Sequence, residues 1–388
     1  MAESVSGPLS GMRVLDLSGV GPGARCSRIL ADFGAEVLRV APPTGSGGQR
    51  LSAPYYGYGA SRGWRFIGMD LKSEAVIDIV HQLAARSDVV VEGFRPGVAD
   101  RLGVGYEQLR RDNPALVYAS VSGFGSDGPY ALKPGHDINY VSLAGAIAFD
   151  EEGAPVVPPL TVADAAGGGM HAAVSILAAL HQAVRTGEGS RLDVSMTDGT
   201  LYLMALPVDE YLATGRDDGP NTAILSGGYA CYGFYRTADE EWLAVGAIES
   251  GFFANLCTVL ECREWIPEQL KPESQDAIRA AFRHAFGTRT RDEWLRAFEG
   301  IDACVSAVNT VADLRTEPQF ARRDAFVTAR HPDHGVFSQV GPLLAGMPRD
   351  GGEVDAGDPA RGDAWEVLDE LGTPVGDREA LLRGGLIS

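Results

Sequence analysis

Short apolar runs and longer stretches with helical periodicity alternate along the first half of the chain. The apolar runs predict strands at residues 12–17, 36–40, 66–71, 88–92, 116–122 and 191–196. Between them, apolar residues spaced three and four apart predict helices that end at Phe33 and Arg86, and a long helix at 164–186 that Gly187 terminates. Strands that alternate with helices are typical of a doubly wound α/β domain with a parallel sheet.

The second half of the chain has a different pattern. A helical segment at 198–213 and a polar stretch at 214–221 are followed by predicted strands at 229–235 and 242–247, and then by helices at 252–261, 275–286 and 291–299. We therefore expect an α/β protein that has a large Rossmann-like domain and a smaller α+β domain. Its predicted parts are the large domain at 1–197, a linker helix and loop at 198–224, the small domain at 225–328, and a C-terminal segment at 329–388 that returns to the large domain.

Composition narrows the classes of function. The 388 residues carry a formal charge of -19, so the chain lacks the basic surplus with which proteins bind nucleic acid or anionic membranes. Its five cysteines are scattered and never form a Cys-x-x-Cys pair, which favours neither a disulfide framework nor a zinc site. The first residues are polar, without the apolar core of a signal peptide, and we expect a cytoplasmic location and no metal.

The loop after the first strand matches a permissive form of the dinucleotide-binding fingerprint. Its sequence is Gly19-Val20-Gly21-Pro22-Gly23-Ala24. An NAD site needs an acidic residue at the end of the second strand, where this chain has Arg39. An arginine suits a phosphorylated ribose, which NADP and coenzyme A both have, so residues 12–40 alone would also fit an NADP-dependent oxidoreductase.

Basic residues recur near the predicted strands. Arg95 follows the strand at 88–92, at the carboxyl end where open parallel sheets bind ligands. Arginines scattered over the surface would give the same pattern, and the sequence leaves both interpretations open. The candidates for binding coenzyme phosphates are Arg39, Arg62, Arg65, Lys72 and Arg95.

Two titratable residues stand out between the fifth strand and the long helix. Asp164 lies where the helix begins, as its N-cap or in its first turn, although such an aspartate is more often a structural cap than a catalyst. The glycines at 167–169 permit close approach of backbone or ligand, or merely tight packing. His136, within Gly-His-Asp-Ile-Asn-Tyr, could equally be an ordinary loop histidine.

Motifs along nearly the whole chain resemble those of the family III CoA-transferases, and within that family more closely those of the α-methylacyl-CoA racemases of actinobacterial type. They are Gly-Pro-Gly at 21–23, Gly-Ala-Glu-Val at 34–37, Asp-Leu-Lys at 70–72, Val-Glu-Gly-Phe-Arg-Pro-Gly-Val at 91–98, Gly-His-Asp-Ile-Asn-Tyr at 135–140, Thr-Gly-Glu-Gly at 186–189, Asp-Val-Ser-Met at 193–196 with Asp198, and Val-Gly-Ala-Ile-Glu at 245–249. The resemblance implies an enzyme of CoA thioesters, built as an intertwined homodimer of two interlocked chains. Coenzyme A would then be part of the substrate, with no separate cofactor.

The resemblance also implies catalytic roles for His136, Asp164 and Glu249. Inversion at C2 of an acyl-CoA removes a proton on one face and returns one on the other, through an enolate. His136, assisted by Glu249, would serve one face and Asp164 the other, with amide groups at the start of its helix facing the thioester oxygen. The chain departs from the family pattern at Ala41, Pro42 and Trp64, so some coenzyme contacts are expected to differ.

Three hypotheses about function follow. An α-methylacyl-CoA racemase or epimerase is favoured, because both His136 and Glu249 are present. A CoA-transferase is the alternative, in which Asp164 would be a nucleophile that forms an aspartyl-CoA intermediate. An acyl-CoA-binding homologue without activity is the third. The acyl group could be branched fatty, aryl or sterol-derived.

Overall fold

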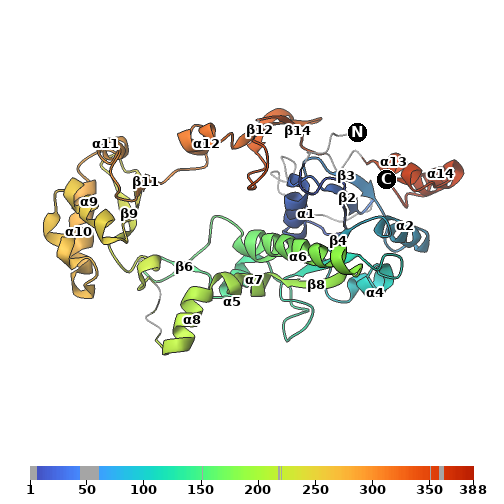
Figure 1. The fold of residues 1–388 in the computed structure, drawn as a ribbon, viewed down its shortest axis with the longest axis horizontal. Helices are drawn as coiled ribbons and strands as arrows, with labels where there is room; N and C mark the ends of the chain where they lie inside the picture. Colours follow the sequence, from blue (N-terminus) through green and yellow to red (C-terminus); the bar gives the residue numbers. More distant parts are fainter. Residues whose placement is uncertain are drawn as a thin grey trace. The chain divides into compact units, whose positions relative to one another are not determined.

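The computed structural model describes residues 7–43, 61–150, 152–216, 219, 221–349, 351–357 and 362–388. The chain forms two compact units (Figure 1). The first contains Met1–Ile147, Val157–Val208 and Pro318–Ser388, and the second contains Ala148–Val156 and Asp209–Glu317. The chain leaves the first unit at Ala148–Val156, inside the expected large domain, and again at Asp209, within the expected linker. It returns at Pro318, earlier than the expected boundary at 329.

A six-stranded parallel sheet organises the first unit. Its strand order is β3-β2-β1-β4-β5-β8. The chain runs outward from β1 in one direction and from β4 in the other, so the order reverses between these two strands, as in doubly wound folds. The strands are β1 (Arg13–Asp16), β2 (Glu36–Ala41), β3 (Arg65–Gly68), β4 (Val89–Glu92), β5 (Val117–Ser122) and β8 (Ser190–Ser195). All six predicted strands are confirmed to within a few residues.

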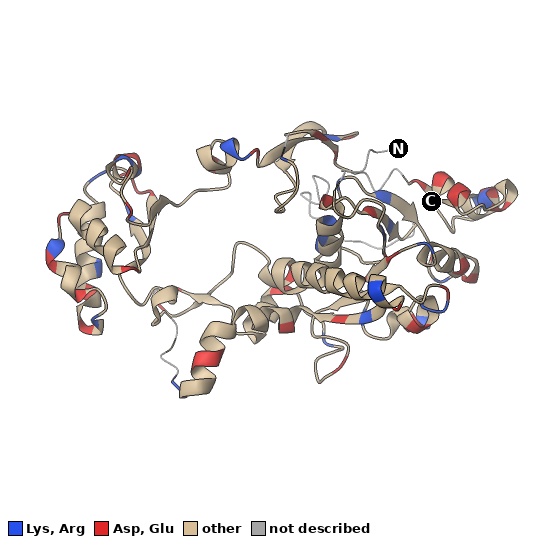
Figure 2. Ribbon diagram, viewed as in Figure 1, with Lys and Arg blue, Asp and Glu red and all other residues tan. Residues whose placement is uncertain are grey.

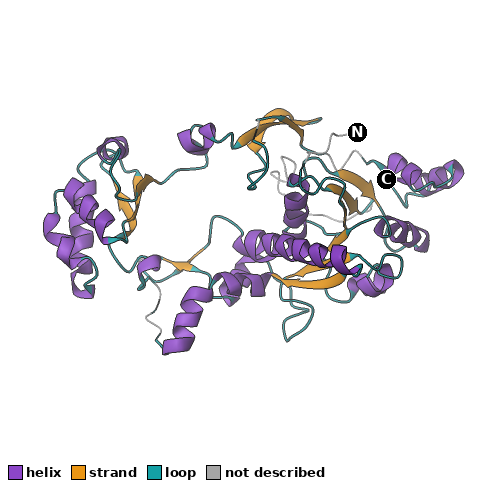
Figure 3. Ribbon diagram, viewed as in Figure 1, coloured by secondary structure: helices purple, strands orange, loops and turns teal. Residues whose placement is uncertain are grey.

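Helices cover both faces of this sheet (Figure 3). On one face, α1 (Pro22–Asp32) and α6 (His171–Thr186) pack through Leu30 and Ile176 onto apolar strand residues. On the other face lie α2 (Glu74–Ala84), α4 (Tyr106–Leu109) and α13 (Ala364–Glu370). The chain end joins the same sheet, because Ser388 and Gly68 exchange backbone hydrogen bonds of 3.0 and 2.7 Å. The C-terminal segment therefore belongs to the core of the first unit.

The second unit is a small α+β structure. Its antiparallel sheet has the order β11-β10-β9, from β9 (Tyr232–Arg236), β10 (Trp242–Gly246) and β11 (Val305–Ala307). Three helices cover it: α9 (Ser250–Val259), α10 (Gln275–Phe286) and α11 (Arg291–Ala297). An aromatic cluster that includes Tyr235, Phe282 and Phe286 fills its core.

Two features of the fold, a π-helix and a small sheet near residue 330, have no counterpart among the sequence predictions. Residues 163–186 form one continuous helix, but its first part, η2 (Ala163–Met170), is a π-helix. Near residue 330 a three-stranded sheet forms, in the order β13-β12-β14.

The elements not yet named are α3 (Val98–Leu102), α5 (Asp137–Leu143), β6 (Ala148–Phe149), β7 (Pro155–Val156), α7 (Met196–Leu203), α8 (Ala205–Thr214), α12 (Pro318–Arg322), β12 (Phe326–His331), β13 (Gly335–Val340), β14 (Glu353–Asp355), α14 (Val375–Arg383) and the short 3-10 helices η3 (Ile224–Ser226), η4 (Arg263–Glu268), η5 (Pro272–Ser274) and η6 (Asp313–Arg315).

Among the described residues, one helix, Ala163–Thr186, is long and apolar enough to cross a membrane by length and composition. Ala172, Ile176 and Ala183 on this helix are buried in the cluster that joins it to the sheet. A core helix has the same composition as a membrane span, and this packing accounts for the apolar residues that face the sheet, whereas Val174 and Val184 on the same helix are exposed.

Candidate active site

The carboxyl ends of β1 and β4 meet at the point where the strand order reverses. The loop after β1 runs beside β4, with the amide of Leu17 donating to the carbonyl of Val91 at 2.8 Å. It ends at Gly21, the residue before α1, whose φ of 90° favours glycine. Doubly wound sheets bind ligands at such an edge.

His136 is the N-cap of α5, a short helix that follows β5. The backbone amide of His136 donates to Oδ1 of Asn139 at 3.0 Å, and the hydroxyl of Tyr140 donates to the carbonyl of Gly135 at 2.6 Å. The Tyr140 ring fills the space beside Gly123 and Gly135, where an added Cβ would lie 2.5 and 2.8 Å from it. These contacts hold the turn in place and leave the imidazole exposed.

Asp164 lies in the first turn of η2 and is half-buried; Val162, not Asp164, is the N-cap. Its backbone amide donates to Oδ1 of Asp137 at 2.8 Å, which connects the start of η2 to the residue after His136. On the other side, a Cβ placed on Gly21 would lie 3.8 Å from Oδ2 of Asp164. Asp164 therefore sits at the sheet edge, between α5 and the loop after β1.

Two amide groups at this helix start already have hydrogen-bond partners. The amide of Asp164 binds Asp137, and that of Ala165 donates to the carbonyl of Thr161 at 2.9 Å. These two amides thus have partners within the chain and help to shape the turn.

Electrostatics connects the groups around Asp164. Burial raises the pKa of its carboxyl above the ordinary value, and the negative charge of Asp137 raises it further. Arg25 and His136 act in the opposite direction and lower this pKa. His136 is thus close enough to Asp164 to influence the pKa of its carboxyl.

The glycine run explains why η2 can lie so close to its neighbours. A Cβ on Gly167 would meet the carbonyl of Met196 at 2.6 Å, and one on Gly168 would meet Pro22 at 2.7 Å. A Cβ on Gly169 would meet that of Arg25 at 2.8 Å. Of the two roles open from the sequence, the structure shows tight packing of η2 against α1 and α7.

Glu249 belongs to the second unit, where it is the exposed N-cap of α9. The buried side chain of Gln269 holds the preceding loop, because its amide donates to the carbonyls of Ile248 at 2.6 Å and Ala247 at 3.3 Å. Gln275 donates in turn to the carbonyl of Gln269 at 3.0 Å. The backbone that carries Glu249 is therefore firmly placed within its own unit.

Two of the five basic candidates are used inside the first unit. Arg62 is 4% exposed and forms an ion pair with Asp32 at 2.6 Å. Its guanidinium also donates to the carbonyl of Val340 at 2.7 Å. Arg39 donates to the carbonyl of Gly19 and lies 3.8 Å from the fully buried carboxyl of Asp16. Both arginines fix local structure.

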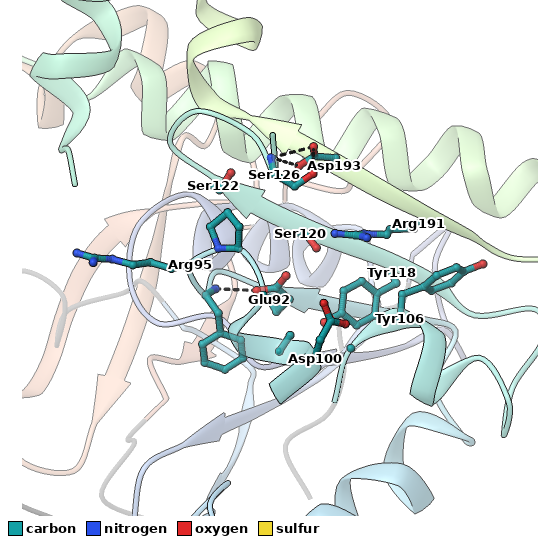
Figure 4. Close-up of a pocket in the computed structure, with 15 residues that line it drawn as sticks. Glu92, Arg95, Asp100, Tyr106, Tyr118, Ser120, Ser122, Ser126, Arg191 and Asp193 are labelled. Carbon is teal, nitrogen blue, oxygen red and sulfur yellow. Dashed lines mark hydrogen bonds between the residues drawn. The ribbon is translucent and has the colours of Figure 1, made fainter. Parts of the chain in front are cut away.

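The other three candidates reach the surface. Arg65 pairs with Glu370 of α13 at 3.0 Å, and Lys72 is exposed after β3. Arg95 is exposed at the end of β4 and points away from the acidic side chain of Glu92 (Figure 4). The structure thus does not gather the five candidates into one cluster.

A small cavity lies beneath the loop that carries Arg95. It encloses about 20 Å³, enough for about one water molecule and too little for a coenzyme. Burial raises the pKa of Glu92 in its wall, and that carboxylate accepts a hydrogen bond from the amide of Phe94 at 2.6 Å. Glu92 thus shapes the turn that carries Arg95.

Sequence reasoning missed Asp137 and Arg25 as parts of this site. Asp137 lay in the quoted motif, but nothing in the sequence indicated that its carboxylate would bind a backbone amide 27 residues away. Arg25 directly follows the glycine-rich stretch at 19–24, and the dinucleotide-binding fingerprint concerns that stretch only. Among the described residues, no group of three or more His, Cys, Asp or Glu side chains is placed to hold a metal ion.

The sequence matches the model of CoA-transferase family III over residues 9–364. The chain belongs to this family. It is 37% identical to an α-methylacyl-CoA racemase of Homo sapiens, over 88% of this chain and 87% of the relative, and 31% identical to a succinyl-CoA–D-citramalate CoA-transferase of Chloroflexus aurantiacus, over 92% and 91%. A crystal structure of a CaiB/BaiF family protein from Brucella suis covers 85% of this chain, and 94% of its own length, with a TM-score of 0.72 and 27% identity.

Proposed function

We propose that the protein is an α-methylacyl-CoA racemase, which inverts C2 of 2-methyl-branched acyl-CoA thioesters. The observation that carries the proposal is the hydrogen bond from the amide of Asp164 to Asp137, because it ties the segment that carries Asp164 to the helix start that carries His136, at the edge where doubly wound sheets bind ligands. The similarity to named racemases supports it.

The proposed chemistry is a proton transfer between two faces of one carbon. In one direction the carboxylate of Asp164 takes the proton from C2, and the imidazolium of His136 delivers a proton to the opposite face of the enolate. In the other direction the neutral imidazole of His136 is the base and the carboxylic acid of Asp164 the donor. The raised pKa of Asp164 suits this exchange, since a carboxylate with a higher proton affinity is a stronger base for the C2 proton.

Lys72 and Arg95 are our first candidates for contact with the coenzyme phosphates, because both are exposed beyond the ends of sheet strands. Arg39, at the end of β2, pairs with Asp16, and Arg65 pairs with Glu370. These two arginines would bind coenzyme phosphates only with nitrogen atoms that those partners leave available. Arg62 is the least accessible of the five.

The alternative is transfer of CoA between carboxylic acids, with Asp164 as nucleophile. The similarity to CoA-transferases of the same family supports this alternative, and both chemistries would use Asp164. Incubating the enzyme with acyl-CoAs in deuterated water separates them. A racemase places deuterium at C2, whereas a transferase moves CoA to an added carboxylate and leaves C2 unlabelled. The second outcome would reject the racemase assignment.

We also propose that the enzyme is an intertwined homodimer in which Glu249 of one chain assists His136 of its partner. The exposure of α8 supports this. None of its residues is buried, and its large apolar side chains Leu206, Tyr211 and Leu212 are 78%, 51% and 72% exposed. Its charged residues are only Asp209 and Glu210 (Figure 2). An apolar helix that the described part of the chain leaves uncovered is typical of an interface.

Mixed dimers test this arrangement directly. If each site joins two chains, coexpression of Glu249→Gln and Asp164→Asn chains produces hybrids with one intact site, and about a quarter of the wild-type activity returns. If each site lies within one chain, every site in the mixture carries one defect and activity stays at the level of the single variants. That result would reject the shared site.

A further inference from the structure

Arg25 projects from the first turn of α1 toward the start of η2. Its Nη2 donates to the hydroxyl of Thr161 at 2.7 Å, and the carbonyl of Thr161 accepts the amide of Ala165. Its Cβ lies against Gly169, where a side chain would clash at 2.8 Å. The guanidinium is therefore held by a hydrogen bond to the turn that precedes Asp164.

Other charged and titratable groups face Asp164 from the elements packed around it. From α5 come His136, Asp137 and Tyr140, and the negative charge of Asp164 contributes to raising the pKa of Tyr140. Asp198 of the adjacent α7 is exposed to solvent. Asp137 favours the protonated form of Asp164, whereas Arg25, from α1, favours the ionised form.

We infer that Arg25 is a positioning residue that keeps Asp164 available as a carboxylate. The inference rests on the proposed racemase function. The residue does not touch the reacting carbon; it acts through the carboxyl of Asp164 and through the Thr161 turn.

The two catalytic groups would share one proton in the active enzyme. With Asp164 ionised and His136 protonated, the enzyme accepts one enantiomer; with Asp164 protonated and His136 neutral, it accepts the other. Arg25 stabilises the first of these forms and Asp137 the second. The two charges thus act in opposite directions on the proton of Asp164, which each direction of a racemase uses in a different form.

The test is the pH dependence of kcat/KM in both directions for wild type, Arg25→Gln and Arg25→Lys. Removing the cation raises the proton affinity of Asp164, so the acid limb in Arg25→Gln moves to higher pH. At a pH just below the wild-type midpoint, kcat/KM falls about three- to tenfold, the effect of losing a partly exposed opposite charge. Both directions change equally, because the equilibrium constant of the reaction is fixed. Arg25→Lys restores most of the wild-type profile.

The matched control is Arg185→Gln, which removes one exposed cation from the far end of the helix that begins with η2. It should leave the profile unchanged. If Arg25→Gln lowers kcat/KM by the same factor at every pH, or raises only KM, the inference fails, since those results indicate a structural role or direct contact with substrate. A wild-type enzyme without α-proton exchange would instead reject the proposed function, and the inference with it.

Discussion

The basic residues expected to bind coenzyme differ sharply in what the fold does with them. Arg62 is buried and bound to Asp32 and to the carbonyl of Val340, whereas Arg95 is exposed at the end of β4. In the sequence both are arginines close to predicted strands. The difference shows that an arginine near a strand end is available to a ligand only if no internal acid or carbonyl already binds it.

Arg62→Ala has the largest expected effect among the tests of this difference between Arg62 and Arg95. Removing a buried cation leaves Asp32 with Arg28 alone and the carbonyl of Val340 without its donor, and we expect a loss of about 3 kcal/mol in the free energy of unfolding. Urea unfolding at fixed protein concentration measures it. The affinity of the folded variant for acyl-CoA should be unchanged, and a large loss of affinity with intact stability would reverse the roles assigned to Arg62 and Arg95.

Arg95→Ala should have the opposite signature. The exposed side chain contributes little to folding, but loss of a charged hydrogen bond to a phosphate weakens acyl-CoA binding by about 1.5 to 3 kcal/mol. Calorimetric titration with CoA, dephospho-CoA and a pantetheine thioester shows which phosphate is concerned. An unchanged dissociation constant for CoA would remove Arg95 from the binding site.

Glu92→Gln tests the turn that carries Arg95, and its expected effect on stability is the smallest of the three variants. Burial raises the pKa of Glu92 above its ordinary value of 4.5, so the folded chain binds this proton more tightly than the unfolded chain. The stability that depends on this proton is therefore present at acid pH and is lost as the pH rises above the ordinary value. The variant keeps an acceptor for the amide of Phe94, and its free energy of unfolding should depend less on pH. At neutral pH this free energy should differ from that of wild type by less than about 1 kcal/mol. A steeper dependence would contradict the assigned burial of the charge.

The sheet and its helices could be predicted because each has a strong local signal. The strands at 88–92 and 116–122 contain short apolar runs, at 89–91 and 116–119. The helix that ends before Gly187 has a clear core face and C-cap, with a φ of 75° at this glycine. The π-helix could not be predicted, because it depends on close approach to Pro22 and Met196 from other parts of the chain.

The site was predictable only in part for the same reason. The motifs indicated His136 and Asp164, but Asp137 and Arg25 act through contacts with residues distant in the sequence. The separation of buried from exposed arginines likewise depends on tertiary partners such as Asp32. Such pairings leave no periodic pattern in one sequence.

The central claim is that His136 and Asp164 serve opposite faces of C2. The most direct measurement is deuterium incorporation from solvent into each enantiomer of a 2-methylacyl-CoA by wild type, His136→Ala and Asp164→Ala. Wild type should label both enantiomers. Each variant should lose interconversion and keep slow exchange with one enantiomer only, the two variants with opposite preference, at rates lower by roughly 10² to 10⁴. Equal labelling of both enantiomers by either variant, or no labelling by wild type, would contradict the account.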